Sequence, residues 1–281
     1  MPAAALRPLS AGEVLDVSFG LFRRMFATLF VIQLICMTLP FLINVYYTGT
    51  GAGFSAMLLL GSLVSFVLSA LASAATAIAI SESYLERPIS AGEALRRALP
   101  RLGPLLAVSL LVGVLVVVAS IPFFFLVGGA AFTLARSGGV PSGLAIFSVL
   151  VGIASLALPL FVAAGVSIAT PVVVLEERIG AIEALSRAWF LTRGYRLRIA
   201  GLLFVCLILI MIPYMGLLLL GGAFVSGAAG AQSVWVPVVA LAGRLLLTPI
   251  LYCLITLVYY DLRVRKEGFD LEMLAASLQP A

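Results

Sequence analysis

The absence of histidine from all 281 residues limits the chemistry open to this chain. Histidine is the commonest general base near neutral pH and a frequent metal ligand, so a histidine triad and a histidine-ligated metal site are excluded. Cys36, Cys206 and Cys253 lie in long apolar stretches with no CxxC spacing, which is typical of residues that fill space between helices. We find no constellation of nucleophile, base and metal ligands. The sequence therefore predicts a protein that is not an enzyme and that holds no metal or cofactor.

Arg244 is the one charged residue well inside an apolar stretch. An arginine at that depth in a membrane is costly and usually faces a cavity or a partner. Trp235 lies earlier in the same stretch, about 14 Å away along a helix, so the Arg244 side chain also has the reach to snorkel towards the outer headgroups. Both interpretations stay open. With Gln33 and Asn44, Arg244 forms the predicted intramembrane polar site.

A second polar site is predicted just before the fifth apolar stretch, where basic and aromatic residues are densest. Arginines beside tryptophan and tyrosine suit the anionic headgroups of an inner leaflet, although positive charge that only fixes membrane topology gives the same pattern. The predicted headgroup contacts are Arg187, Arg193, Arg196, Arg198, Trp189 and Tyr195.

The elements that must hold these residues are membrane-spanning helices. Hydrophobic residues make up 63% of the chain and charged residues 10%, with a mean hydropathy of +1.22, whereas a soluble domain carries roughly 25% charged residues. Lipid must therefore surround much of the surface, and we predict an all-α integral membrane helical bundle, one domain over residues 1–281. The stretches long enough to cross roughly 30 Å of hydrocarbon are residues 25–46, 54–81, 102–127, 143–175, 199–223 and 234–260.

The distribution of charge predicts which side of the membrane faces the cytosol. Of the 17 basic residues 15, with all 12 carboxylates, lie before the first stretch, after the last, or in the connections after the second and fourth. Basic connections stay in the cytosol, so we expect a multi-pass protein of the cytoplasmic membrane with both termini inside. Glu13 and Asp16 precede the first stretch, which favours a retained helix over a cleaved signal. The net charge of +5 belongs to this pattern, so we expect no nucleic-acid partner.

A short motif predicts a threefold internal repeat over residues 9–87, 88–178 and 179–266. Each unit contains Ala-x-Glu-x-Leu behind a serine or glycine, and Ser-x-x-Glu is a capping box in which hydroxyl and glutamate satisfy backbone donors. Each unit is expected to hold an amphipathic interfacial helix and two spans, the second of them long. Residues 267–281 are expected to form a short amphipathic cytosolic tail. The expected caps are Ser10 with Glu13, Ser90 with Glu93, and Gly180 with Glu183.

Segments at the beginning, middle and end of the chain resemble a bacterial membrane-protein family. They are residues 9–13 (LSAGE), 21–24 (LFRR), 171–176 (PVVVLE), 184–194 (ALSRAWFLTRG) and 259–270 (YYDLRVRKEGFD). They are similar to proteins related to the glycerophosphoryl diester phosphodiesterase membrane domain. Some members of that family carry a soluble phosphodiesterase barrel, which these 281 residues do not contain. The resemblance therefore implies a stand-alone membrane protein and no catalytic residue.

These features predict a non-catalytic scaffold or accessory subunit that packs with membrane lipids, with other membrane proteins or with copies of itself. Gly- and Ala-rich spans, such as residues 69–75, favour close helix contacts. The alternative is a carrier or scramblase for lipids or small amphiphiles, with Arg244 facing a cavity. A threefold repeat differs from the inverted pair common in secondary transporters, which disfavours the carrier.

Overall fold

The computed structural model describes residues 8–50, 56–85, 87, 89–136, 147, 150–152, 154–176, 179–225 and 231–268. Over this part of the chain the regular structure is helical and no strand occurs. Six of its helical segments are long and apolar enough to cross a membrane. The predictions of an all-α chain and of six such helices are confirmed.

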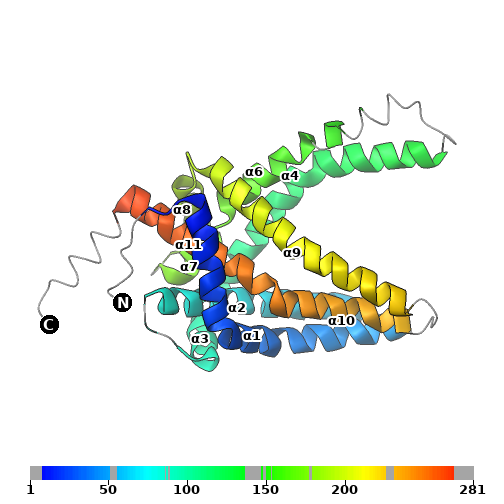
Figure 1. Ribbon diagram of the computed structural model, residues 1–281, viewed down its shortest axis with the longest axis horizontal. Coiled ribbons are helices and arrows are strands. Elements are labelled where there is room, and N and C mark those ends of the chain that lie inside the picture. The colour runs from blue at the N-terminus through cyan, green and yellow to red at the C-terminus, as the bar shows by residue number, and fades with distance from the viewer. Residues whose placement is uncertain are drawn as a thin grey trace, which may run out of the picture.

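The elements follow one another in an order close to the expected one. They are α1 (Ala11–Thr50), α2 (Ala56–Tyr84), α3 (Ala91–Ala98), the 3-10 helix η1 (Leu99–Arg101), α4 (Leu102–Arg136), α6 (Ala157–Val166), α7 (Ala169–Leu175), α8 (Ala181–Leu191), α9 (Arg196–Val225), α10 (Ala231–Leu246) and α11 (Thr248–Glu267). The short α3 and α8 precede the long α4 and α9. The α1 helix combines both parts in one element, and Figure 1 shows it turning partway along its length. The tail predicted over 267–281 lies, beyond Gly268, outside the described residues.

Helices α1 and α3 begin at the serines expected to cap them. At α1 the capping box is complete: Glu13 N donates to Ser10 Oγ (3.3 Å), and Ser10 N donates to Glu13 Oε2 (2.7 Å). At α3 only the hydroxyl half forms, with Glu93 N donating to Ser90 Oγ at 3.2 Å. The Glu93 carboxylate instead accepts a hydrogen bond from Arg97 at 2.6 Å. The second bond of the capping box, from Ser90 N to Glu93, therefore does not form.

Glycine decides the geometry at two other helix ends. Gly180, before α8, has no side chain to accept a bond, and only the reciprocal half of the box forms, from Gly180 N to Glu183 Oε2 at 3.2 Å. Gly268 ends α11 with φ of +65°, a left-handed conformation that glycine adopts without a Cβ penalty. Of the three predicted caps only the first is therefore complete, and the second and third each form one bond of the box.

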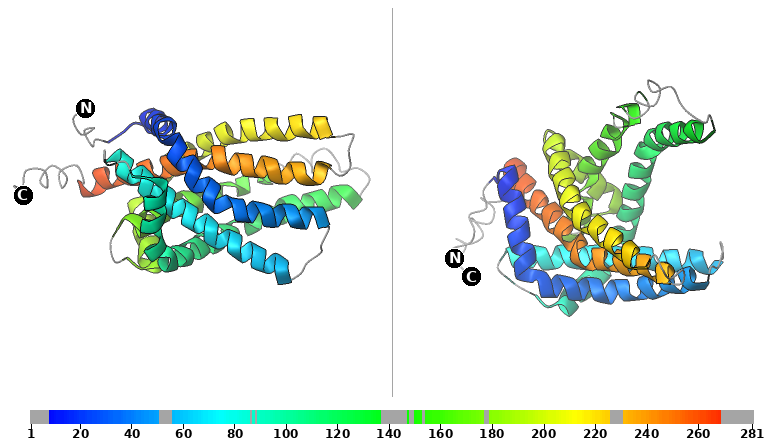
Figure 2. Two further views of the ribbon diagram at one scale, coloured as in Figure 1. Left: turned by 90° about the horizontal axis from the view of Figure 1, so that it is seen from below. Right: turned by 45° about the vertical axis from the view of Figure 1, so that its right-hand side comes forward.

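The helices gather at one end of the molecule and spread towards the other. The start of α1, the α8 helix and the end of α11 lie together at what we call the ionic end (Figures 1 and 2). From there α1 runs beside α2 and α10, and packs on α11. Helices α4 and α6 contact each other and project away from α10 (Figure 1). Only 6% of the apolar segment of α4 and 11% of that of α9 are buried within the chain.

The core forms where small residues let α2 approach its neighbours. Ala72, Ala74 and Ala75 are at most 1% exposed, and small side chains of this kind bring helix backbones close together. Ala74 and Ala75 share one buried cluster with Leu257 and Tyr259 of α11, both of which are almost fully buried. This close contact matches the expectation from the Ala-rich sequence of α2.

Two of the three spans expected to run long are interrupted. Where residues 143–175 predict one span, the structure separates α6 from α7, and where residues 234–260 predict another, it separates α10 from α11. The breaks lie just before Pro171 and Pro249. A proline has no N–H for the carbonyl four residues earlier and its ring crowds that carbonyl. The α2 helix contains no proline and is continuous.

Candidate functional site

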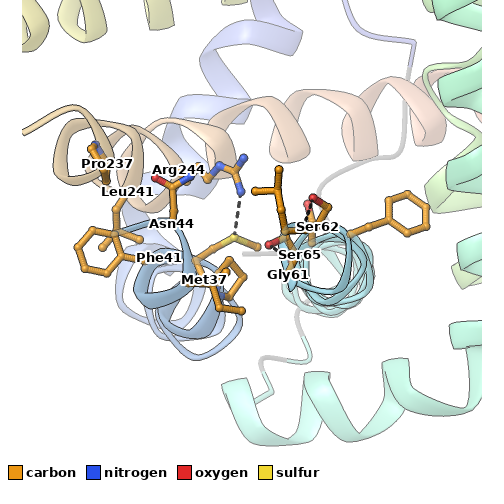
Figure 3. Close-up of a pocket in the computed structure, with 14 residues that line it drawn as sticks. Met37, Phe41, Asn44, Gly61, Ser62, Ser65, Pro237, Leu241 and Arg244 are labelled. Carbon is orange, nitrogen blue, oxygen red and sulfur yellow. Dashed lines mark hydrogen bonds between the residues drawn. The ribbon is translucent and has the colours of Figure 1, made fainter. Parts of the chain in front are cut away.

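Arg244 lines a cavity of about 710 Å³ between α1, α2 and α10. Figure 3 shows its side chain extending from α10 into the space between the other two helices. The cavity follows the second half of α1 and the first half of α2, away from the ionic end. Because α10 ends at Leu246, the break before Pro249 comes directly after the turn that carries Arg244.

Among the described residues that line this cavity, Arg244 alone is charged. Its Nη1 lies 3.7 Å from the sulfur of Met37, which is a weak acceptor. The hydroxyls of Ser62 and Ser65 donate to carbonyls of their own helix, both at 2.8 Å, so their oxygens still have a lone pair to accept with. Asn44 adds an amide to the same wall. No carboxylate in the described part of the chain pairs with Arg244, so the guanidinium has donors available for an anion.

Gln33 does not join Arg244 and Asn44. It is buried between α1 and α2, where its Nε2 donates to Thr76 Oγ1 at 3.4 Å. The predicted intramembrane trio therefore divides: two members line the cavity, and Gln33 holds two helices together.

Gly243 is a site residue that sequence reasoning missed. A Cβ at this position would lie 2.7 and 2.8 Å from two ring carbons of Tyr214, closer than real Cβ contacts. The glycine therefore lets α9 pack on α10 directly beside Arg244. Its position next to Arg244, the arginine predicted to lie inside a span, is the signal that could have found it, since small residues mark close helix contacts in membranes.

At the ionic end the buried carboxylate of Asp261 fixes the backbone of Leu9. It accepts from Leu9 N at 2.8 Å, from Arg198 at 3.1 Å and from Arg265 at 2.9 Å. Arg198 and Arg265 also donate to Leu9 O, at 2.5 and 2.6 Å. We call these four residues the clasp. Through charge-assisted hydrogen bonds, it holds the entry to α1 against the start of α9 and the end of α11.

A second ionic group surrounds Glu176 at the end of α7. Arg187 of α8 forms ion pairs with Glu176 and, at 3.0 Å, with Glu267. Tyr259 Oη donates to the Glu176 carboxylate at 3.1 Å. Burial alone would lower the pKa of Arg187, but its bond to Glu176 and the two carboxylate charges together raise that pKa above its ordinary value. Arg187 therefore stays charged and joins α7, α8 and α11.

These ion pairs divide the predicted headgroup cluster. Arg187 and Arg198 are bound to carboxylates, and Tyr195 packs under Arg265, whose guanidinium carbon lies 5.6 Å from its ring centroid. The other members line a pocket of about 270 Å³ formed by Ser186, Trp189, Phe190, Arg193 and Arg196. Within the described ranges, this pocket therefore contains the part of the cluster that has no carboxylate partner.

Comparison with known proteins adds no relative. No protein-family model matches the chain, and searches of curated proteins and of solved structures find no match. The resemblance to the glycerophosphoryl diester phosphodiesterase membrane domain therefore stays a prediction. The described residues contain no group of three or more metal-binding side chains. What the two pockets offer is positive charge beside apolar surface, which suits binding of anionic amphiphiles.

Proposed function

We propose that this protein is a non-catalytic, multi-pass membrane protein that binds an anionic lipid in the cavity at Arg244. The observation that supports the proposal is a single guanidinium in an otherwise uncharged wall, without a carboxylate partner in the described part of the chain. By insertion scales an arginine at the centre of a membrane helix costs roughly 2.5–3.5 kcal/mol. A bound phosphate or carboxylate offsets that cost through charge-assisted hydrogen bonds.

The size and lining of the cavity fit a lipid. Its volume of about 710 Å³ falls in the range of roughly 300–1,000 Å³ typical of small-molecule sites. Phe41, Leu58 and Phe66 offer apolar surface, while Asn44 and Ser65 offer polar atoms. This amphipathic wall suits a headgroup together with the first part of its acyl chains better than it suits a free inorganic ion.

Lipid transfer is the form of this function that the helix geometry favours. The interruption between α10 and α11 follows Arg244 directly, and interrupted helices form the substrate sites of many transporters. A carrier or scramblase for anionic lipids is therefore the version we put to the test.

A scaffold or accessory subunit is the second candidate function, and helices α4 and α9 favour it. Their apolar segments are only 6% and 11% buried, with Phe125 80% exposed and Leu219 70% exposed. Surfaces of this kind face lipid or pack on another membrane protein or a second copy of the chain. In this role α4 and α9 contact a protein partner.

The proposal includes the membrane arrangement that both functions require. We place the ionic end in the cytosol, with both termini there, and retain the three units over residues 9–87, 88–178 and 179–266. Caps at Ser10 and Ser90, short helices before α4 and α9, and ion pairs collected at one end support this arrangement. We also propose kinship with the glycerophosphoryl diester phosphodiesterase membrane domain, supported by the five segments that resemble it.

Native mass spectrometry of the full chain in mild detergent tests both functions, because it counts bound lipids and protein copies together. We expect an anionic phospholipid to copurify with the native protein. The occupied fraction should fall about tenfold in Arg244→Gln, since a hydrogen bond to a charged group contributes roughly 1.5–3 kcal/mol. Arg24→Gln, at an exposed position of α1, is the matched control because it removes the same charge elsewhere.

Equal lipid occupancy in the native protein and in Arg244→Gln would contradict lipid binding in the cavity. In liposomes, lipid transfer that Arg244→Gln abolishes would support the carrier, and transfer no faster than in empty vesicles would exclude it. A stoichiometric partner or a defined homo-oligomer in the mass spectrum would support the scaffold. A monomer without protein partners would count against it.

A further inference from the structure

Three basic side chains meet where α8 joins α9. We call this the basic pocket, and it consists of Trp189, Phe190, Arg193, Arg196 and Lys266. Lys266, at the end of α11, donates from Nζ to Phe190 O at 2.8 Å and lies 5.0 Å from the centroid of the Phe190 ring. The arginines of the clasp pair with the carboxylate of Asp261, and Arg187 pairs with that of Glu176. The described residues offer no carboxylate to the three cations of the basic pocket.

Arg196 is stacked on Trp189 beside Phe161, and its hydrogen-bond donors are only partly used. Its guanidinium carbon lies 3.6 Å from the centroid of Trp189 and 4.9 Å from that of Phe161. One amino group donates to Trp189 O at 3.2 Å, while Nε is buried and has no hydrogen-bond partner within the described ranges. Stacking fixes a guanidinium without using all its in-plane donors. The amino N–H groups that Trp189 O does not use are therefore arranged in advance to donate to an oxyanion.

The turn between the two helices places Arg193 beside Arg196. It includes Gly194, whose φ of +89° is a conformation that favours glycine. The Arg193 side chain is exposed and makes no side-chain hydrogen bond to any described residue. Like charges brought this close repel one another. A doubly charged anion relieves that repulsion more than a singly charged one does.

The surroundings of the basic pocket are apolar and exposed, which indicates a lipid as the source of the anion. Phe190 is 60% exposed and Leu197 is 84% exposed. Trp189, 40% exposed, is a residue type enriched at membrane surfaces. Acyl chains can lie along these side chains while the headgroup enters the basic pocket, an arrangement that a soluble anion does not need.

We infer that the basic pocket binds the phosphate monoester headgroup of a membrane lipid at the ionic end of the bundle. A phosphate monoester carries about −1.5 to −2 charges at pH 7 and offers three acceptor oxygens, against a single charge on a phosphodiester. This inference goes beyond the Arg244 cavity, because the two sites use different residues and lie towards different ends of the helices.

Binding of defined lipids to the purified full chain in detergent tests the inference. The probes are dioleoyl phosphatidic acid, dioleoyl phosphatidylglycerol and soluble glycerol 3-phosphate, titrated by microscale thermophoresis. We expect phosphatidic acid to bind about tenfold more tightly than phosphatidylglycerol, and glycerol 3-phosphate to bind more weakly still. The double variant Arg193→Gln, Lys266→Gln should remove the preference for phosphatidic acid while leaving the stacked Arg196 in place. Arg196→Lys should weaken the preference for phosphatidic acid, because lysine keeps the charge but lacks the flat guanidinium that stacks on Trp189.

Two controls separate this site from the rest of the molecule. Arg24→Gln removes a charge from α1 and should leave the preference for phosphatidic acid unchanged. The titrations are repeated in an Arg244→Gln background, which removes lipid binding at the cavity, so the two proposals can fail independently. Equal affinity for the two lipids, or an unchanged preference in the folded double variant, would overturn the inference. Glycerol 3-phosphate binding as tightly as phosphatidic acid would overturn the assignment to a lipid.

Discussion

Asp261 shows how one side chain sets the position of a distant backbone segment. Its carboxylate accepts from Leu9, which lies 252 residues earlier in the chain. The two arginines of the clasp bond both to Asp261 and to Leu9 O. The side chain of Asp261 is only 4% exposed, whereas those of Arg198 and Arg265 are 24% and 21% exposed. The carboxylate is therefore the member that the structure can least easily lose.

Asp261→Asn should lower the free energy of unfolding by about 2–3 kcal/mol. The substitution keeps the shape of the side chain but leaves two partly buried arginines without their counter-charge, and breaking a buried pair costs roughly 3–5 kcal/mol when both members are fully buried. Thermal unfolding in detergent, followed by intrinsic fluorescence, measures the loss. Asp16→Asn, at an exposed position, should change the midpoint little. Equal midpoints for both variants would show that the clasp does not stabilise the fold.

The partners of individual charged residues could not be read from the sequence. Arg187 and Arg193 have the same type and lie in the same short segment, yet only Arg187 meets a carboxylate in the described part of the chain. The difference arises because Glu176 and Glu267 belong to α7 and α11, and their distance from α8 depends on tertiary packing. The capping pair of Ser10 and Glu13 was predictable because its bonds span three residues of local sequence.

At the scale of elements, Trp189 connects helix packing to the basic pocket. One side of its ring faces Gly165 of α6, where a Cβ would lie 2.5 and 2.7 Å from ring atoms. Arg196 lies over the same indole. The contact between α6 and α8 therefore determines where the stacked guanidinium sits.

Gly165→Ala should destabilise the protein by about 1–3 kcal/mol, because an added methyl group in a closely packed contact displaces a large ring. In a Trp235→Phe background, where Trp189 is the only tryptophan, its emission should shift to the red as the ring becomes more exposed. The matched control is Gly201→Ala in α9, where an added Cβ meets nothing within 4 Å and alanine is the better helix former by about 1 kcal/mol. An unchanged emission spectrum and midpoint in Gly165→Ala would refute this account.

The existence of the elements was predictable, and their continuity was not. Long apolar stretches and Ser-x-x-Glu motifs predict six helices and several of their starting points. Pro171 and Pro249 were visible in the sequence, but prolines such as Pro40 and Pro122 lie inside continuous helices. Whether a proline kinks or ends a membrane helix depends on which neighbours satisfy the freed carbonyl, and this information comes from the fold.

At the scale of the whole molecule, the described charged residues lie mainly at the ionic end. The Arg244 cavity lies away from that end, along the second half of α1 and the first half of α2. The ion pairs of Asp261, Glu176 and Glu82 all connect elements at the ionic end. An excess of basic residues on one face predicts that this face stays in the cytosol. In the orientation that we propose, the basic pocket would meet the inner leaflet and the Arg244 cavity the outer leaflet.

Cysteine labelling of intact cells measures this orientation. The native cysteines are buried, so an introduced cysteine should dominate labelling by a membrane-impermeant maleimide. We expect Ser137→Cys to be labelled in intact cells and Arg96→Cys only after permeabilisation. The connection that contains Ser137 has one basic residue, Arg136, whereas the connection that contains Arg96 has several, and basic connections stay in the cytosol. The reverse pattern would place both pockets in the opposite leaflets, and the lipid assignments would have to be exchanged.

The clasp also has a consequence for biosynthesis. Leu9 is synthesised 252 residues before Asp261, and Arg265 follows later still. The helix that begins at Ala11 is therefore made before the groups that fix its entry exist. In the nascent protein Leu9 therefore stays outside the clasp until α11 has been synthesised, so the clasp closes late in folding.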